Sequence, residues 1–264
     1  MGATRIEFRL RMVIMPILIA LGFWAPWIGV RGGGTRIPLL EWLPLELSRL
    51  GLLSFSLAVP LVIVLAALIS AKGMVFRRWG AAYLGPATVI HRNMRGEALV
   101  ASGPYRYVRN PLYIGLWAMT TALAFLMPVS GALFVALVVP VFLLRLTLGE
   151  EGFLTCELGQ PYRDYLCAVP RLVPRFPSTL PPAASKPQWL RAVFAEFSPI
   201  GVFLALAVFS WSYNNLLMEK VILVCFGISI VARGLLIGKR RQSAPAEEQG
   251  SSVPGRGNPP SHNE

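Results

Sequence analysis

The sequence predicts an all-α integral membrane protein of about six transmembrane helices. Hydrophobic residues make up 55% of the 264 residues and charged residues only 14%, whereas a soluble globule has roughly 25% charged residues. The apolar residues form separate blocks, most of them close to the ~20 residues that a helix needs to cross a bilayer. The Lys and Arg residues, which give a net charge of +12, lie between these blocks. This arrangement favours loops that face anionic lipid over binding to nucleic acid.

The N-terminal region, residues 1–71, is expected to contain two spans. Three arginines precede the first apolar block, at about 12–30. This block lacks the small residues of a signal-peptide cleavage site, so we interpret it as a retained span. A polar connection is expected over 31–48, and the second block covers about 50–71 with a kink predicted at Pro60.

The middle of the chain, residues 72–176, is expected to hold a central helical hairpin between two polar segments. Residues 72–111 contain seven basic residues and one acidic residue, which is typical of an interfacial segment. The apolar blocks at about 112–127 and 130–149 are separated only by a short turn. So short a connection predicts two antiparallel helices.

The C-terminal region, residues 177–238, is predicted to be a linker and a second hairpin, and the tail 239–264 is predicted to be disordered. If the N-terminus lies inside, the inner segments hold nineteen basic residues and the outer segments four. The positive-inside rule therefore places both termini in the cytoplasm. We expect a multi-pass protein of a bacterial inner membrane.

Two polar segments are expected to meet at the cytoplasmic face, because the central hairpin returns the chain to the side from which it started. Asn110 and Pro111 form a good helix start, and the free N–H groups there suit a carboxylate. Tyr113 can stack on a purine or form a hydrogen bond. Glu150, at the other end of the hairpin, can accept hydrogen bonds from ribose hydroxyls and favours a cationic ligand.

Each of these residues also has a purely structural interpretation. The arginines can serve as positive-inside anchors, the tyrosines as an interfacial belt, and the two acids as a solvated helix end. The three cysteines have no paired spacing and only two histidines are present. No disulfide framework and no metal site are therefore expected.

The combined order of the segments is more specific than any single residue. Residues 103–113 read Gly-Pro-Tyr-Arg-Tyr-Val-Arg-Asn-Pro-Leu-Tyr, and Glu-Glu-Gly-Phe-Leu follows the hairpin at 150–154. Gly-Gln-Pro-Tyr-Arg-Asp-Tyr and Val-Pro-Arg-Leu-Val-Pro come next, at 159–165 and 169–174. This order resembles the isoprenylcysteine carboxyl methyltransferase family and its bacterial relatives. Phospholipid methyltransferases share the broader scheme.

The resemblance implies S-adenosylmethionine as the cofactor, bound in a pocket at the cytoplasmic face. It implies transfer of a methyl group to a lipophilic or small-molecule acceptor, whose reactive group is a carboxylate, a thiol or an amine. Arg109 and Glu150 are the catalytic candidates, and Arg145 and Glu151 are the candidates for contact with the acceptor. The cofactor-binding candidates are Glu97, Ala98, Leu99, Val100, Tyr105, Asn110, Pro111, Leu112, Tyr113 and Glu150.

Two positions depart from the family pattern. Asn110 stands in place of the usual His, which removes a titratable group, and Leu146 stands where eukaryotic members have an Arg that contacts the substrate. The acceptor therefore stays open. An NADPH-dependent membrane reductase of the sterol reductase type, or a non-enzymatic transporter or scaffold, remains as an alternative. The oligomeric state is not predicted.

Overall fold

The computed structural model describes residues 2–24, 37–84, 101–181, 186–195 and 197–212, together with isolated positions between 217 and 231. Within these ranges the chain forms helices and turns, and its only β-type pairing is an isolated bridge between Pro38 and Pro128. The predicted all-α fold is confirmed for this part of the chain. The elements are α1 (Arg5–Trp24), α2 (Leu39–Arg49), α3 (Phe55–Leu84), η1 (Gly103–Arg106), α5 (Pro111–Ala124), α6 (Val129–Leu158), α7 (Gln160–Ala168), α8 (Trp189–Ala195) and α9 (Phe197–Ser212).

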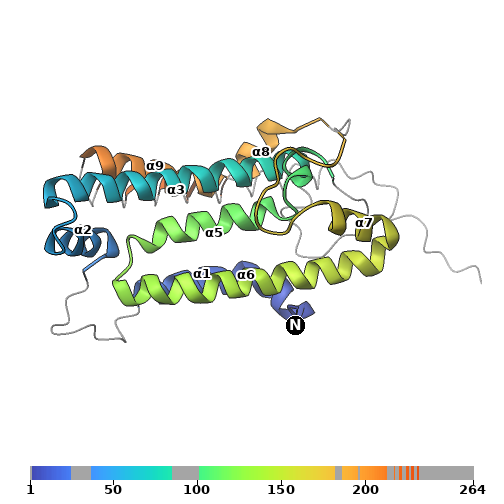
Figure 1. Ribbon diagram of the computed structural model, residues 1–264, viewed down its shortest axis with the longest axis horizontal. Helices are drawn as coiled ribbons and strands as arrows, with labels where there is room; N and C mark the ends of the chain where they lie inside the picture. The colour runs from blue at the N-terminus through green and yellow to red at the C-terminus, as the bar shows by residue number, and fades with distance from the viewer. Residues whose placement is uncertain are drawn as a thin grey trace, which may run out of the picture.

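The long helices form an elongated bundle. Helices α1, α3, α5, α6 and α9 run along its long axis, α2 lies at one end, and η1, α7 and α8 gather at the other (Figure 1). Along the bundle α9 packs on α3, α3 on α5, α5 on α6, and α6 on α1. The end that carries α7 and η1, called the polar end below, also holds the start of α1 (Figure 1).

The central hairpin is present where the sequence predicts it. Helix α5 ends at Ala124 and α6 begins at Val129, so four residues make the turn. The backbone N–H groups of Leu39 and Leu40 donate to the carbonyl oxygens of Met127 and Phe125, at 2.8 Å each. These bonds hold α2 against the turn. Helix α6 runs nine residues beyond the predicted block, so Glu150 lies inside the helix.

The structure adds detail to two predicted segments. The expected polar connection over 31–48 contains a helix, α2, whose buried residues Leu40 and Pro44 pack into the bundle. The second apolar block, about 50–71, does not form a separate helix, because α3 continues from it without a break to Leu84. A 30-residue helix is about 45 Å long, whereas the hydrocarbon core is about 30 Å thick. The basic residues from Lys72 onward can therefore lie beyond the core without ending the helix.

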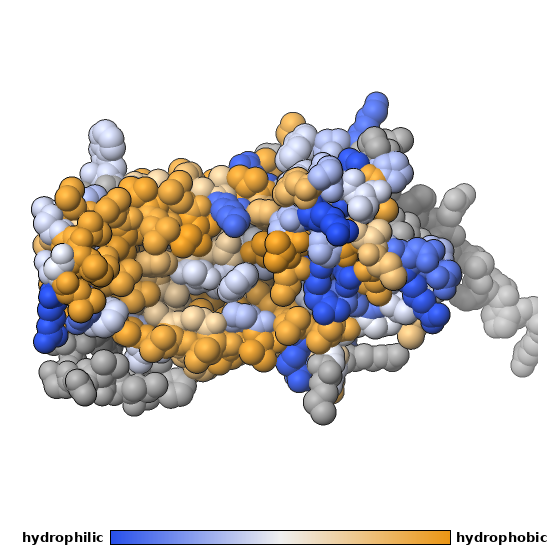
Figure 2. All heavy atoms as spheres, in the orientation of Figure 1, coloured by the Kyte–Doolittle hydropathy of each residue, from blue (hydrophilic) through white to orange (hydrophobic). Residues whose placement is uncertain are grey.

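The exposed surface of the bundle is apolar along most of its length. Figure 2 shows hydrophobic residues over the middle of the molecule and many hydrophilic residues near the polar end. Large side chains such as Leu61 and Leu68 of α3, and Leu137 and Val141 of α6, are more than half exposed. An apolar surface of this extent is unusual for a soluble monomer and is typical of contact with lipid.

Helices α3 and α6 are long and apolar enough to cross a membrane, and each contains an 18-residue stretch with a mean hydropathy of 2.3. The apolar parts of α5 and α9 are shorter. The membrane character of the chain is supported, and the number of six spans stays a prediction. Most of the second helix of the predicted C-terminal hairpin lies outside the described residues. The whole of the tail 239–264 also lies outside them.

Glycines allow two helix pairs to approach closely. An added Cβ at Gly73 of α3 would lie 2.8 Å from the carbonyl oxygen of Gly115 of α5, and the reverse distance is also 2.8 Å. On the other side of the bundle, an added Cβ at Gly131 of α6 would collide with the carbonyl oxygen of Gly22 of α1. Small residues at such crossings let helix backbones pack together in lipid.

Candidate active site

Tyr113 and Glu150 lie together at the polar end of the central hairpin. Tyr113 is in the first turn of α5, and Glu150 is in the last third of α6. The Tyr113 hydroxyl lies within hydrogen-bonding reach of the Glu150 carboxylate, and Tyr105 of η1 is near enough to influence Tyr113. The structure therefore brings together candidates from three segments that are up to 45 residues apart in sequence.

Asn110 and Pro111 begin α5 as the sequence predicts. Asn110 is the N-cap residue and Pro111 lies in the first turn, where its missing N–H costs nothing. The Asn110 side chain makes no capping hydrogen bond. Its Nδ2 atom is buried and has no hydrogen-bond partner among the described residues. This amide is a donor available to a ligand.

Arg11 of α1 is a member of this cluster that the sequence analysis did not select. Its charge acts on both Tyr113 and Glu150, so the guanidinium lies near them. Phe8 and Met15, three residues before and four after it, are buried between α1 and α6. This helical spacing of a basic residue between two apolar ones is a usable signal, but the positive-inside count does not distinguish Arg11 from Arg5 and Arg9.

Glu151, next to Glu150, is buried in an ion-pair network. Its side chain is 8% exposed and accepts from Arg109 at 3.0 Å and from Arg171 at 2.7 Å. The hydrogen bond to Glu151 raises the pKa of Arg171 above its ordinary value. Glu150 and Glu151 therefore lie in different surroundings, because one residue turns a helix by about 100°.

Arg109 connects three elements through one side chain. Its Nε donates to the carbonyl oxygen of Val169 at 2.6 Å, and its Nη2 donates to the carbonyl oxygen of Leu166. Its backbone N–H donates to the carbonyl oxygen of Pro170 at 3.0 Å. Together with the Glu151 pair, these bonds join the start of α5 to α6 and to the end of α7. The geometry favours a positioning role for Arg109.

The segment that contains η1 lies against the loop after α7. The Tyr165 hydroxyl donates to the carbonyl oxygen of Tyr105 at 2.8 Å, and Arg106 donates to the carbonyl oxygen of Leu180. The rings of Tyr107 and Phe176 stack with centroids 4.8 Å apart. Burial raises the pKa of Tyr165. Its hydroxyl therefore stays protonated and remains a donor.

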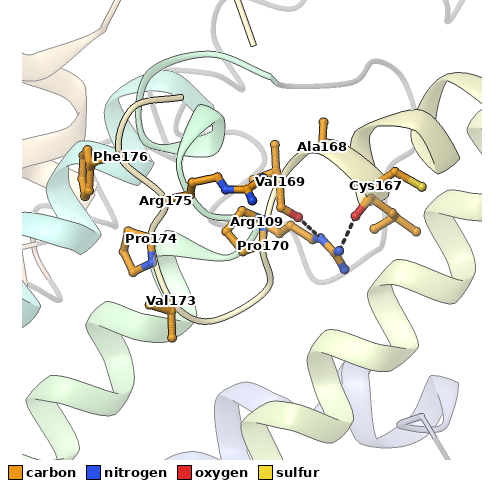
Figure 3. A pocket seen from close by; sticks show the side chains of 10 residues that line it. Arg109, Cys167, Ala168, Val169, Pro170, Val173, Pro174, Arg175 and Phe176 are labelled. Carbon is orange, nitrogen blue, oxygen red and sulfur yellow. Dashed lines mark hydrogen bonds between the residues drawn. The ribbon is translucent and has the colours of Figure 1, made fainter. Parts of the chain in front are cut away.

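A hollow of about 500 Å³ lies beside this loop. Figure 3 shows Arg109, residues 167–170 and residues 173–176 around it, and Leu166 completes the lining. Among the candidate site residues only Arg109 contributes to it. The hollow therefore lies next to the ion pair of Arg109 and Glu151. It does not coincide with the Tyr113 and Glu150 cluster.

Arg145 points to the start of α1. Its guanidinium pairs with Glu7 at 3.0 Å, and its carbonyl oxygen accepts from the N–H of Ala3 at 2.8 Å. Thr4 and Glu7 form reciprocal capping bonds, at 2.7 and 3.2 Å. Leu146, the neighbour of Arg145, is 1% exposed. The predicted cofactor residues Glu97, Ala98, Leu99 and Val100 lie outside the described residues.

Gly103 is required at the start of η1. Its φ is +56°, and an added Cβ would collide with the ring of Tyr83. We predict that Gly103→Ala displaces the Tyr105 carbonyl from Tyr165. The left-handed backbone alone costs about 1–2 kcal/mol for a residue with a Cβ. The loss should appear as a lower midpoint of thermal unfolding in detergent.

Gly159→Ala is the matched control for that prediction. Gly159 also has a positive φ, +62°, but no atom lies within 4 Å of its added Cβ. Gly103→Ala should therefore be the more damaging change, because it adds a collision to the same backbone strain. Equal losses in the two variants would contradict a packing role for Gly103.

Residues 61–160 match the phospholipid methyltransferase family model. This range covers most of α3 and all of η1, α5 and α6. Protein-S-isoprenylcysteine O-methyltransferase from Schizosaccharomyces pombe is 34% identical over 91 residues. The predicted family resemblance is confirmed. No solved structure matches the chain.

The matched range, called the methyltransferase core below, contains Tyr113, Glu150 and Glu151. It supports the predicted methyltransferase class in that part of the chain. The alignment with the yeast protein covers 34% of this chain and 38% of that protein. Helices α1, α2, α8 and α9 lie outside the range matched by the family model, so Arg11 of α1 does too.

Proposed function

We propose that this protein is a membrane-embedded methyltransferase that uses S-adenosylmethionine and methylates a lipophilic or small-molecule acceptor. The observation that carries the proposal is the contact of Tyr113, on the helix that Asn110 begins, with Glu150 within the methyltransferase core. The three residues combine an amide donor, an aromatic hydroxyl and a carboxylate at one end of the central hairpin. Methylation of a carboxylate, a thiol or an amine is compatible with this set.

The residues present fit this cofactor. The buried Nδ2 of Asn110 lacks a partner among the described residues, and the amino-acid carboxylate or a purine nitrogen of the cofactor could accept from it. The Glu150 carboxylate can accept from ribose hydroxyls or an ammonium group and is attracted to a sulfonium. We propose that Tyr105, Pro111, Leu112 and the segment 97–100 complete the site.

The bound cofactor would supply an activated methyl group, so the protein has to position the reactants and exclude water. A carboxylate or thiolate acceptor needs no general base. Tyr113 orients the Glu150 carboxylate. Arg109 and Glu151 fix the start of α5 relative to α6, and we assign them this positioning role in place of direct contact with the reactants. Arg145 has the same positioning role, because its ion pair with Glu7 fixes the start of α1 on α6.

The acceptor is proposed to reach the site from the bilayer. The exposed faces of α3 and α6 are apolar, and a lipophilic molecule can move along them towards the polar end. The S. pombe relative is named for an isoprenylated cysteine, which makes a prenylated thioether with a carboxylate the first acceptor class to test. We propose that the polar end faces the cytoplasm, with both termini on that side.

Calorimetry with S-adenosylmethionine on the purified protein tests the cofactor. We expect binding, and we expect Glu150→Gln and Tyr113→Phe each to weaken it by roughly 10- to 100-fold, the equivalent of one hydrogen bond to a charged group. Glu157→Gln is the matched control, because Glu157 lies on the same helix and is exposed. Its affinity should equal that of the wild type.

Transfer should then be followed with methyl-labelled cofactor and mass spectrometry of lipid and small-molecule extracts. A labelled product that disappears in Glu150→Gln supports the proposal. Absence of S-adenosylmethionine binding would overturn it, and binding of NADPH in its place would point to the reductase alternative.

A further inference from the structure

Arg11 carries a buried cationic nitrogen that no described residue satisfies. Its Nη1 atom has no hydrogen-bond partner among the described residues. Burying a guanidinium N–H without an acceptor is unfavourable, and most buried polar groups in folded proteins have a partner. The position therefore indicates an acceptor that the described part of the chain does not supply.

The other arginines around this cluster already have carboxylate partners. Arg109 and Arg171 share Glu151, and Arg145 pairs with Glu7. Arg11 takes part in no ion pair within 4.0 Å in the described ranges. Glu150 is nevertheless close enough for an electrostatic interaction with Arg11. Of Arg11, Arg109, Arg145 and Arg171, Arg11 is therefore the one suited to bind the anionic group of a ligand.

The guanidinium of Arg11 is held in place on the side of the bundle where α1 meets α6. It lies over the ring of Phe8, 3.9 Å from the centroid. Phe8 is 3% exposed and belongs to the buried cluster that also contains Leu146. The Glu7 to Arg145 pair fixes the start of the same helix on α6. A cation positioned in this way loses little freedom when it binds a ligand.

We propose that Arg11 binds a carboxylate at the methyl-transfer site, either that of the cofactor's amino-acid portion or that of the acceptor. A guanidinium matches a carboxylate with two parallel hydrogen bonds. The place of this carboxylate, beside Tyr113 and Glu150, rests on the proposed function. Helix α1 lies outside the range matched by the family model, so the family match does not assign this residue a role.

Binding measurements with two pairs of probes distinguish the sources of the carboxylate. S-adenosylhomocysteine contains the amino-acid carboxylate, and methylthioadenosine lacks it. S-farnesylthioacetic acid contains an acceptor-like carboxylate, and its amide lacks the charge. Each probe is titrated into the full chain in detergent, as wild type and as Arg11→Gln, Arg11→Lys and Arg9→Gln. Arg9 lies on the same helix and is exposed, so Arg9→Gln controls for the loss of charge.

We expect Arg11→Gln to weaken one carboxylate probe by about 10- to 100-fold and to leave its uncharged counterpart unchanged. Arg11→Lys should retain part of the affinity, because it keeps the charge and loses the planar fork. Arg9→Gln should bind like the wild type. The pair of probes that responds identifies the source of the carboxylate.

The unfolding midpoint without ligand separates binding from a structural role. Arg11→Gln removes a guanidinium whose Nη1 atom has no partner among the described residues, so that midpoint should change little. A lower midpoint with unchanged affinity for both acids would make Arg11 a structural partner of Glu150 and would overturn the inference. So would equal affinities of wild type and Arg11→Gln for all four probes.

The same measurements test the proposed methyltransferase function independently of the role of Arg11. Suppose that the wild type binds no S-adenosylhomocysteine but that its preference for the farnesylated acid over the amide depends on Arg11. The carboxylate site is then supported and the proposed methyltransferase function is rejected. If the wild type binds S-adenosylhomocysteine and Arg11→Gln changes no affinity, the proposed function stands and the role of Arg11 does not. If the wild type binds neither acid, both are overturned.

Discussion

Glu151→Gln is expected to be the most destabilising change of a single side chain at the polar end. The carboxylate of Glu151 is the shared partner of Arg109 and Arg171, and the side chains of Glu151 and Arg109 are only 8% and 14% exposed. Breaking a buried ion pair from one side costs about 3–5 kcal/mol, because a charge is left without compensation. Arg171, at 38% exposed, adds little to this cost, since solvent screens it.

The measurement is thermal unfolding in detergent, with Glu157→Gln as the control. For a chain of this size each kcal/mol shifts the midpoint by roughly 2–4 °C, so a decrease of roughly 6–20 °C is expected. Glu157→Gln removes the same charge from an exposed position of α6 and should shift the midpoint by about 1–2 °C at most, since exposed substitutions stay within about 0.5 kcal/mol. A decrease of less than 3 °C in Glu151→Gln would contradict a structural role for Glu151.

Arg171→Gln and the double variant complete this test. The double change should cost less than the two single changes together, because residues in one ion-pair network are not additive. Additive losses would mean that Glu151 and Arg171 act independently. The view that their ion pair connects α6 to the loop after α7 and stabilises the fold would then be rejected.

Gly131→Ala is expected to separate α1 from α6. The added methyl group would collide with the carbonyl oxygen of Gly22, which is part of a helix backbone and cannot move aside like a flexible side chain. Overpacking of a tight contact costs typically 1–3 kcal/mol. Because α1 carries Arg11, the change should also weaken binding of the carboxylate probe that depends on Arg11.

Gly152→Ala is the natural comparison on the same helix. No atom lies within 4 Å of its added Cβ, and alanine is favoured over glycine inside a helix by about 0.5–1 kcal/mol. The unfolding midpoint should therefore stay constant or rise in Gly152→Ala and fall in Gly131→Ala. If Gly131→Ala unfolds at the wild-type temperature, the close crossing of α1 and α6 is not a determinant of stability.

Most of the helical architecture could be predicted from local pattern. Two apolar blocks joined by a short turn predicted the hairpin of α5 and α6, and the Asn110-Pro111 pair predicted where α5 begins. The boundaries of α3 and α6 were predicted less well. Basic or acidic residues interrupt an apolar pattern, but they do not end a helix that continues beyond the bilayer into water.

The candidate site was also predicted only in part. Motif order selected Tyr113 and Glu150, which the hairpin brings together. It assigned Glu150 to the cofactor and Glu151 to the acceptor, but it did not predict the ion pairs of Glu151 with Arg109 and Arg171, because these depend on how each acid is rotated around the helix. It also missed Arg11, since no sequence motif connects residue 11 with residue 150.

The sequence by itself determined that this is a helical membrane protein, where its central hairpin lies, and which methyltransferase family its core resembles. These properties follow from composition, periodicity and segment order, all of which are local along the chain. Only the tertiary structure decided which charges are satisfied within the protein. It assigned Glu151 to Arg109 and Arg171, assigned Glu7 to Arg145, and left the Nη1 atom of Arg11 without a partner among the described residues. Ion pairing depends on distances between side chains remote in sequence, and folding alone sets those distances.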